Sequence, residues 1–133
     1  MSKSAGLHVI MDLYVNDASV FEPKKLNEMF YKLVDLLEMK MLRAPEFIEV
    51  EMDPEILKRV EETGEFADEG GVTAFCVINT SHLSIHTWGL QKFASLDLFS
   101  CKDFDHEKAI SFVKEFLDCS KVNVHVVERF KPA

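Results

Sequence analysis

The chain alternates between segments whose apolar residues recur every second position and segments with the helical spacing. Residues 6–15 show the first pattern most clearly, with an apolar face opposite a mixed face, as in a strand that packs one side on helices. The apolar positions are Leu7, Val9, Met11 and Leu13, and the mixed positions are His8, Ile10, Asp12 and Tyr14. Further strands are predicted over residues 47–52, 72–78, 83–88, 93–101 and 122–127, with residues 89–92 as a hairpin link.

Two segments have a full helical stripe of apolar residues. Pro23 opens the first helix and Asp105 caps the second. The stripes are Leu26, Met29, Phe30, Leu33, Leu36 and Leu37 in the first, and Ala109, Phe112, Val113, Phe116 and Leu117 in the second. A third helix is predicted from its cap Asp53 to about Thr63, on the surface because its stripe is thin, and residues 16–19 are predicted to be loop.

This order of elements predicts one α+β domain over residues 1–133. The economical architecture is a two-layer α/β sandwich, in which a mostly antiparallel sheet carries two long helices on one face. The other face of the sheet mixes polar and apolar residues, so it is available to a second subunit.

Composition limits the classes of protein to which this chain can belong. The net charge of −8 argues against a nucleic-acid surface, which requires clusters of Lys and Arg. No apolar run reaches the ~20 residues that span a bilayer, and no signal-peptide pattern opens the chain. We therefore expect a cytoplasmic protein with neither a nucleic-acid nor a membrane partner. Three cysteines are too few and too scattered for a disulfide scaffold or a CxxC zinc site, so Cys76 and Cys119 are expected to be small apolar fillers.

The segment from residue 51 to residue 69 is strongly acidic. Its acids are Glu51, Asp53, Glu55, Glu61, Glu62, Glu65, Asp68 and Glu69, against Lys58 and Arg59. Such a segment is either a solvated face or an acidic flap that attracts a cationic ligand. Gly70 and Gly71 are expected to close it as a turn.

Residues 79–88 form a polar cluster between apolar strands, and polar residues in such a place point to function. A metal site is not expected, because His82 and His86 would lie about 13 Å apart on a strand at ~3.3 Å per residue. A second chemistry pairs Cys101 with His86: Cys101 would share a face with Asp97 across the hairpin and become an activated thiolate.

The third chemistry is self-cleavage of the backbone. The Ser81 hydroxyl can attack the carbonyl of Thr80 if the turn strains that peptide and a neighbour handles the proton. Ester formation followed by β-elimination would cut the chain and leave a pyruvoyl group at residue 81. Residue types alone do not choose between this reaction and an ordinary turn.

Three motifs occur close together: Gly71-Val72-Thr73, the run from Ser81 to Trp88 (SHLSIHTW), and the run from Asp97 to Cys101 (DLFSC). Together they resemble the prokaryotic S-adenosylmethionine decarboxylase family. The family pattern is GVS, ESHLTIHTWPE and DLFTC at the same spacing. The likeness is dense over residues 71–101, thinner in the first and last strands, and absent between about residues 16 and 70.

The resemblance implies a pyruvoyl-dependent carboxy-lyase made by cleavage between Thr80 and Ser81. Ser81 would become the pyruvoyl cofactor, whose carbonyl forms a Schiff base with the substrate amine and accepts electrons as CO₂ leaves. His86 and Thr73 would assist cleavage, and Cys101 would return the proton. The resemblance also implies a homodimer of cleaved protomers without a metal. Candidate substrate-binding residues are Phe66, Glu69, Trp88 and Asp97.

Two departures from the family pattern leave alternatives open. Thr80 replaces a Glu, and Gly89-Leu90 replaces Pro-Glu, whose Glu contacts the substrate ribose hydroxyls. Leaving those hydroxyls unpaired costs roughly 1–3 kcal/mol each. The first hypothesis is decarboxylation of S-adenosylmethionine in polyamine (spermidine) biosynthesis. The alternatives are decarboxylation of a basic amino acid, arginine or ornithine, favoured by Leu90 and the acidic segment, and a non-cleaving regulatory or ligand-binding paralogue, favoured by Thr80.

Overall fold

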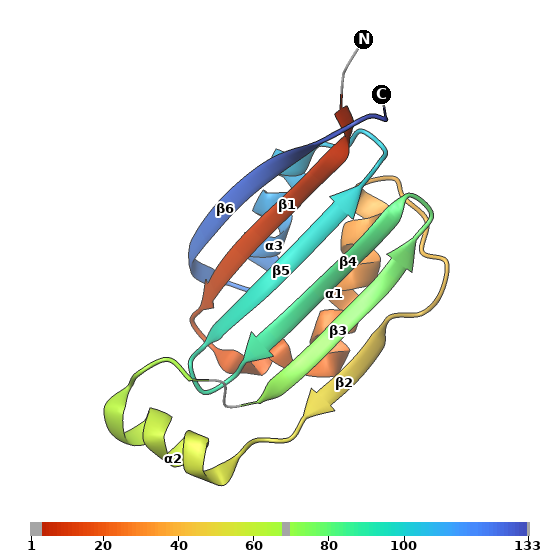
Figure 1. The fold of residues 1–133 in the computed structure, drawn as a ribbon. Coiled ribbons are helices and arrows are strands. Elements are labelled where there is room, and N and C mark those ends of the chain that lie inside the picture. Colours follow the sequence, from red (N-terminus) through yellow and green to blue (C-terminus); the bar gives the residue numbers. More distant parts are fainter. Residues whose placement is uncertain (1–3, 68–69, 133) are drawn as a thin grey trace.

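The computed structural model describes residues 4–67 and 70–132 and has two layers, a six-stranded sheet and a pair of helices on one of its faces (Figure 1). The strands are β1 (Ser4–Val15), β2 (Glu46–Val50), β3 (Gly71–Ile78), β4 (Ser81–Trp88), β5 (Phe93–Ser100) and β6 (Cys119–Phe130). They run in the order β2-β3-β4-β5-β1-β6, and each neighbouring pair is antiparallel. The predicted α+β two-layer architecture is confirmed.

The helices are α1 (Pro23–Leu36), α2 (Pro54–Thr63) and α3 (His106–Phe116). The α2 and α3 helices begin where the sequence predicts, because Asp53 and Asp105 accept hydrogen bonds from backbone N–H groups of the first turn. The α1 and α3 helices cover the sheet, whereas α2 lies beyond the end of β3 and β4 (Figure 1). The chain therefore places its acidic helix at one end of the central strands.

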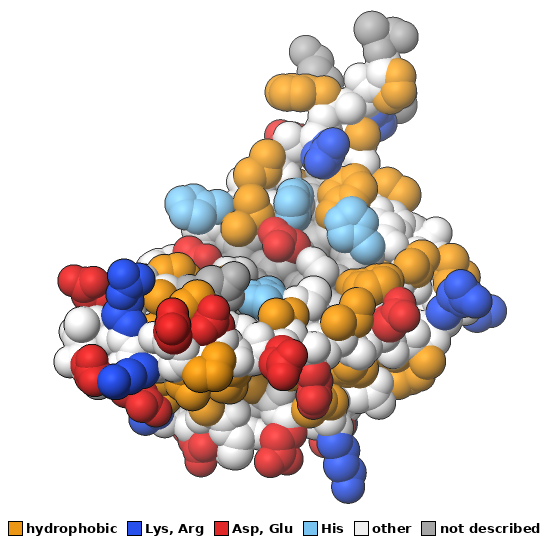
Figure 2. Space-filling model, turned by 60° about the horizontal axis from the view of Figure 1, so that its bottom comes forward, with side chains coloured by type: hydrophobic (Ala, Val, Ile, Leu, Met, Phe, Trp, Pro, Cys, Tyr) orange, Lys and Arg blue, Asp and Glu red, His pale blue; other side chains and the backbone are white. Residues whose placement is uncertain are grey.

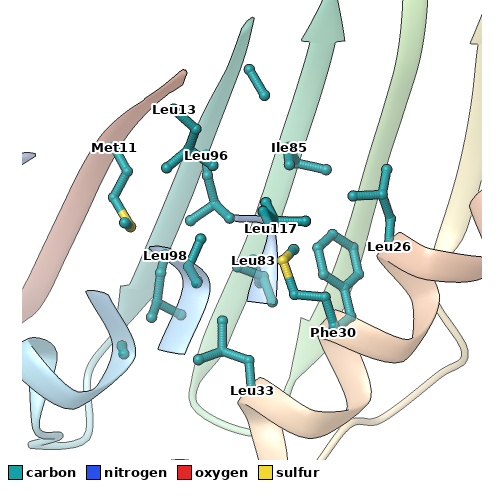
Figure 3. Close-up of a cluster of buried hydrophobic side chains, with 14 of the residues drawn as sticks. Met11, Leu13, Leu26, Phe30, Leu33, Leu83, Ile85, Leu96, Leu98 and Leu117 are labelled. Carbon is teal, nitrogen blue, oxygen red and sulfur yellow. The ribbon is translucent and has the colours of Figure 1, made fainter. Parts of the chain in front are cut away.

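The core fills the space between the sheet and the two covering helices. Inward side chains alternate along each strand, and Figure 3 shows those of β1, β4 and β5 meeting the α1 residues Leu26, Phe30 and Leu33. The largest fully buried side chains are Phe30, Met11, Leu13, Leu26, Met29, Leu33, Leu83, Ile85, Leu96, Leu117 and Val9. Cys76 and Cys119 belong to this core, as predicted. Burial of this size is the main stabilising term of a small domain.

The opposite face of the sheet has no covering layer among the described residues. Apolar side chains remain exposed on it, including Ile48 at 50%, Phe75 at 38% and Val77 at 41%. Figure 2 views this open face obliquely from the α2 end and shows histidine side chains gathered over it. His82 and His86 belong to the outward-facing positions of β4, as the period of two predicts.

Several boundaries differ from the sequence prediction, including the start of β4, which lies at Ser81 and not at residue 83. The β6 strand is longer than residues 122–127, because it pairs with β1 along nearly its whole length. The predicted loop at residues 16–19 leads into a short 3₁₀ helix, Ala18–Phe21, capped by Asp17. The β5 strand ends at Ser100, so Cys101 lies in a bend and not on the strand face that was expected.

Among residues 4–67 and 70–132, no helix has the length and apolar character needed to cross a membrane.

Gly71 fixes the start of β3 and gives the first stability prediction. Its φ of 145° lies in the region that favours glycine, and an added Cβ would collide with the Thr87 carbonyl oxygen on β4. Gly71→Ala should therefore lower the free energy of unfolding by at least ~1 kcal/mol in urea denaturation. Gly89→Ala is the matched control, because nothing lies within 4 Å of its Cβ position, and it should change stability by less than about 0.5 kcal/mol. Equal midpoints for the two variants would contradict the steric account.

Candidate active site

The turn between β3 and β4 places Ser81 against the peptide bond that precedes it. The Ser81 hydroxyl donates a hydrogen bond to the Thr80 carbonyl oxygen. The backbone N–H of Cys101 donates to the same carbonyl at 3.1 Å and to Ser81 Oγ at 3.2 Å. The nucleophile is thus beside its target, and an N–H donor already points at the oxygen where negative charge would develop.

Ser100 holds the side chain of Thr80 in place. It is fully buried, donates from Oγ to Thr80 Oγ1 at 2.8 Å and accepts from the Lys102 N–H at 3.1 Å. The sequence prediction did not single out Ser100. The available signal was a polar residue at an inward position of β5, where Ala94, Leu96 and Leu98 occupy the equivalent places.

A second group of candidate residues lies toward the other end of β3 and β4. Thr73 and His86 are directly paired across the two strands, and Thr73 Oγ1 is 2.5 Å from His86 Nδ1. The His86 ring meets Trp88 edge to face, with ring centroids 4.3 Å apart. This arrangement fixes the plane of the imidazole and leaves its Nε2 edge for a proton.

The two groups do not meet within one chain. Residues 81 and 86 are about 16 Å apart along an extended strand at ~3.3 Å per residue, and successive positions alternate between faces. Ser81 aligns with the inward positions of β4, whereas His86 is outward. The expectation that Cys101 lies beside His86 is wrong, because His86 pairs with Ser95 on β5 and Cys101 follows the end of that strand.

The predicted substrate-binding residues divide in three ways. Phe66 and Trp88 do come together, with ring centroids 5.6 Å apart, and both meet Phe93. Asp97 lies between the two groups of catalytic candidates and pairs with His8 Nε2 at 3.1 Å. Glu69 lies outside the described residues.

A cavity of about 790 Å³ adjoins the Phe66–Trp88 cluster, between α2 and the β4–β5 connection. It is lined by Tyr14, Val60, Glu61, Gly64, Phe66, Leu90, Gln91 and Phe93. Most of these side chains are apolar or aromatic, as is usual for small-molecule sites. Tyr14 and Phe93 were not predicted to bind a ligand, and Glu61 was included only as one acid of the alternative acidic flap. The three residues come from separate elements, β1, β5 and α2.

The ionisable side chains of the described residues do not assemble a metal centre, since no group of three His, Cys, Asp or Glu converges there. The cysteines differ from one another in environment. Burial raises the pKa of the Cys76 thiol to about 11 and that of the Cys119 thiol to about 11. Cys101, next to Ser81, is exposed.

The chain combines a two-layer antiparallel sandwich with a serine hydroxyl that contacts the carbonyl of the preceding residue, which is typical of a class of candidate self-processing proteins. Comparison with known proteins identifies the family. The sequence model for S-adenosylmethionine decarboxylase matches residues 7–130. The chain belongs to the S-adenosylmethionine decarboxylase family.

Individual relatives agree with this assignment. The S-adenosylmethionine decarboxylase proenzyme of Thermotoga petrophila is 34% identical over 127 residues, covering 95% of this chain and 83% of the relative. That of Clostridium botulinum is 29% identical over 131 residues, covering 97% of both. Other matches are shorter: the match to the Pyrobaculum arsenaticum proenzyme is 40% identical over 65 residues and spans about half of that relative, 52%.

A solved structure supports the fold. The crystal structure of the adenosylmethionine decarboxylase from Aquifex aeolicus aligns with a TM-score of 0.74, at 22% identity, over 99% of this chain and 96% of the other.

The contrast between the cysteines predicts a selective modification. Iodoacetamide at pH 8 should alkylate Cys101 in the folded protein and spare Cys76 and Cys119, because thiols with a pKa of about 11 stay protonated at that pH and lie in the core. Peptide mass spectrometry maps the sites, and alkylation in denaturant provides the fully modified control. Equal labelling of all three cysteines in the folded protein would contradict the burial pattern.

Proposed function

We propose that this chain is the zymogen of a pyruvoyl-dependent S-adenosylmethionine decarboxylase. In this proposal it cuts itself between Thr80 and Ser81 and then supplies decarboxylated S-adenosylmethionine for spermidine synthesis. The observation that carries the proposal is the contact of the Ser81 hydroxyl with the Thr80 carbonyl, with the Cys101 N–H on the same oxygen. The family membership of the chain and the names of its relatives support the choice of substrate.

The geometry suits the first step of cleavage. Ser81 Oγ attacks the Thr80 carbonyl carbon, the C–N bond of the peptide breaks, and an ester joins residue 80 to the Ser81 side chain. The Cys101 N–H stabilises the oxygen that becomes negative during this attack, which is the role of an oxyanion donor. Only the carbonyl of residue 80 takes part. Thr80 is therefore compatible with the reaction. Its side-chain hydroxyl takes no part and accepts a hydrogen bond from Ser100.

The second step removes the Cα proton of residue 81. This β-elimination releases the carboxylate of Thr80, and addition of water with loss of ammonia then leaves a ketone at residue 81. Imidazole is a suitable base near neutral pH. When His86 Nδ1 carries its hydrogen and donates to Thr73 Oγ1, Nε2 is left as the acceptor for this proton.

The residues present fit a pyruvoyl group formed in place. It needs a hydroxyl that reaches the preceding carbonyl, and Ser81 meets that requirement at the first position of β4. When formed, the group supplies a carbonyl that binds the substrate amine and withdraws electrons as CO₂ leaves. Cys101 is exposed beside residue 81, and we assign it the return of a proton to the substrate α-carbon.

His86 and Ser81 cannot cooperate within one chain, so we infer that the working site is shared by two copies. In a homodimer, the Ser81–Cys101 end of one protomer would meet the Thr73–His86 group and the aromatic cavity of its partner. The open face of the sheet is the surface for this contact, because Ile48, Phe75 and Val77 remain exposed there.

Self-cleavage is tested by intact mass spectrometry under denaturing conditions. The protein should yield two fragments, residues 1–80 and 81–133, with the second blocked at its N-terminus. Ser81→Ala should give a single uncut chain of unchanged fold, because it lacks the attacking oxygen. Cys119→Ser, in the core far from the turn, is a control that should still be cut. A wild-type chain that stays intact after long incubation would overturn the proposal.

The shared site is tested by complementation between two inactive variants. His86→Ala alone should be cut at least ~100-fold more slowly, which is the usual contribution of a general base. Co-expressed with Ser81→Ala, the His86→Ala chain should be cut again, because the partner provides an intact His86. Tags of different mass identify which chain is cut. If the His86→Ala chain remains uncut in isolated mixed dimers, Ser81 does not use the partner's histidine.

A further inference from the structure

The turn before Ser81 is held by hydrogen bonds from outside the β3–β4 hairpin. The usual two-residue hairpin loops contain residues with positive φ, and neither Asn79 nor Thr80 has one. The Asn79 N–H donates to the Lys40 carbonyl at 2.8 Å, and Asn79 Oδ1 accepts from the Lys40 N–H at 3.1 Å. Thr80 is bonded instead to the end of β5, through its carbonyl and through its side chain. Other elements therefore set the geometry of the peptide bond between residues 80 and 81.

The Ser100 hydroxyl is placed to donate to the Thr80 side chain. It is fully buried and accepts from the Lys102 N–H at 3.1 Å, which leaves its own hydrogen for Thr80 Oγ1 at 2.8 Å. The backbone of Ser100 is paired on both sides, with β1 and with β4. Gly6 on β1 approaches the Ser100 carbonyl so closely that an added Cβ would collide with it. The donor to Thr80 thus has a fixed position.

This hydrogen bond matters for cleavage because Thr80 is branched at Cβ. The Thr80 hydroxyl takes no part in the covalent chemistry, but it shares Cβ with a methyl group, next to the carbonyl carbon that Ser81 must attack. Rotation about χ1 would move that methyl group to another side of the carbonyl carbon. The bond to Ser100 selects one rotamer, and in this rotamer the Ser81 hydroxyl reaches the Thr80 carbonyl oxygen.

Resting on the proposed function, we propose that Ser100 is a positioning residue for self-cleavage, which holds Thr80 in the rotamer that leaves its carbonyl open to Ser81. The step that it assists is the first one. Ser81 Oγ forms a bond to the carbonyl carbon of Thr80, the peptide C–N bond breaks, and the hydroxyl proton passes to the nitrogen of residue 81. The products are an ester and a free amine, and Ser100 keeps its own hydrogen throughout.

The test is a double-mutant cycle on the rate of self-cleavage. Full-length chains are made by cell-free synthesis at equal concentrations, and the appearance of the fragment 81–133 is followed by mass spectrometry. Ser100→Ala should slow cleavage roughly 10-fold, the loss expected for one hydrogen bond that fixes a rotamer. Thr80→Val keeps the branched shape, removes the acceptor and should slow cleavage equally. The double variant should again be slowed about 10-fold and not 100-fold, because both changes remove the same bond.

Two conservative variants separate positioning from a structural role. Ser100→Thr keeps the hydroxyl and should recover most of the wild-type rate. Thr80→Ser has no methyl group to misplace, so adding Ser100→Ala to it should slow cleavage less than about 3-fold. If Ser100→Ala does not fold, Thr80→Val tests the same bond from a half-buried side chain that leaves the Lys102 N–H bonded. A wild-type rate in Thr80→Val, or effects of the two changes that multiply, would refute the positioning role.

Hydroxylamine distinguishes failure of this inference from failure of the proposed function, because it cuts the ester formed in the first step. A wild-type chain that cuts itself, with Ser100→Ala and Thr80→Val equally fast, would remove the role of Ser100 alone. A wild-type chain that stays intact but is cut in hydroxylamine, more slowly after Ser100→Ala, would overturn the decarboxylase and support the role of Ser100. A wild-type chain that stays intact even in hydroxylamine forms no ester and would overturn both.

Discussion

The antiparallel pairing of β3 with β4 is the constraint on which the rest of the site depends. Its register places Thr73 opposite His86 and brings Thr80 and Ser81 to the turn. A slip of one residue would send the inward side chains of β4 to the open face, so the hydrophobic core enforces the register. The close approach of Gly71 to the Thr87 backbone enforces it from the other end of the hairpin. The same register of β3 and β4 is therefore needed to pack the core and to place the reactive groups.

The same pairing explains why the reactive groups are divided. A strand presents alternate residues on opposite faces and separates them by a fixed rise, so one strand cannot bring Ser81 and His86 together. In the proposed shared site, the open face would carry the half that needs a partner, and the turn would carry the half that cuts. Assembly of two copies would then be a condition for maturation, and a lone protomer would remain an inactive chain.

Much of the fold could be predicted from residue pattern, and the site only in part. The alternation of β1 and β4, and the caps Asp53 and Asp105, are local signals that the structure confirms. The predicted position of Cys101 on the face of β5 was wrong. The strand ends earlier because the Cys101 N–H bonds to the turn at Thr80, which is distant in sequence, and a local pattern cannot show this. Glu61 could not be recognised as a cavity residue, since its neighbours there come from β1, β5 and the loop after β4. Such contacts are a product of the tertiary fold.

The turn at Thr80 also divides the sheet between two pieces of chain. The strands before it are β1, β2 and β3, and those after it are β4, β5 and β6, yet β1 lies between β5 and β6 in the sheet. A protein cut at this turn would be two interleaved polypeptides without a covalent link, held by three separate lines of strand pairing. It would keep its native form easily, but once unfolded it could refold only when both pieces meet in solution. The lifetime of the folded protein would then be set by its rate of unfolding. In dilute solution the two pieces would rarely meet, so unfolding would be irreversible.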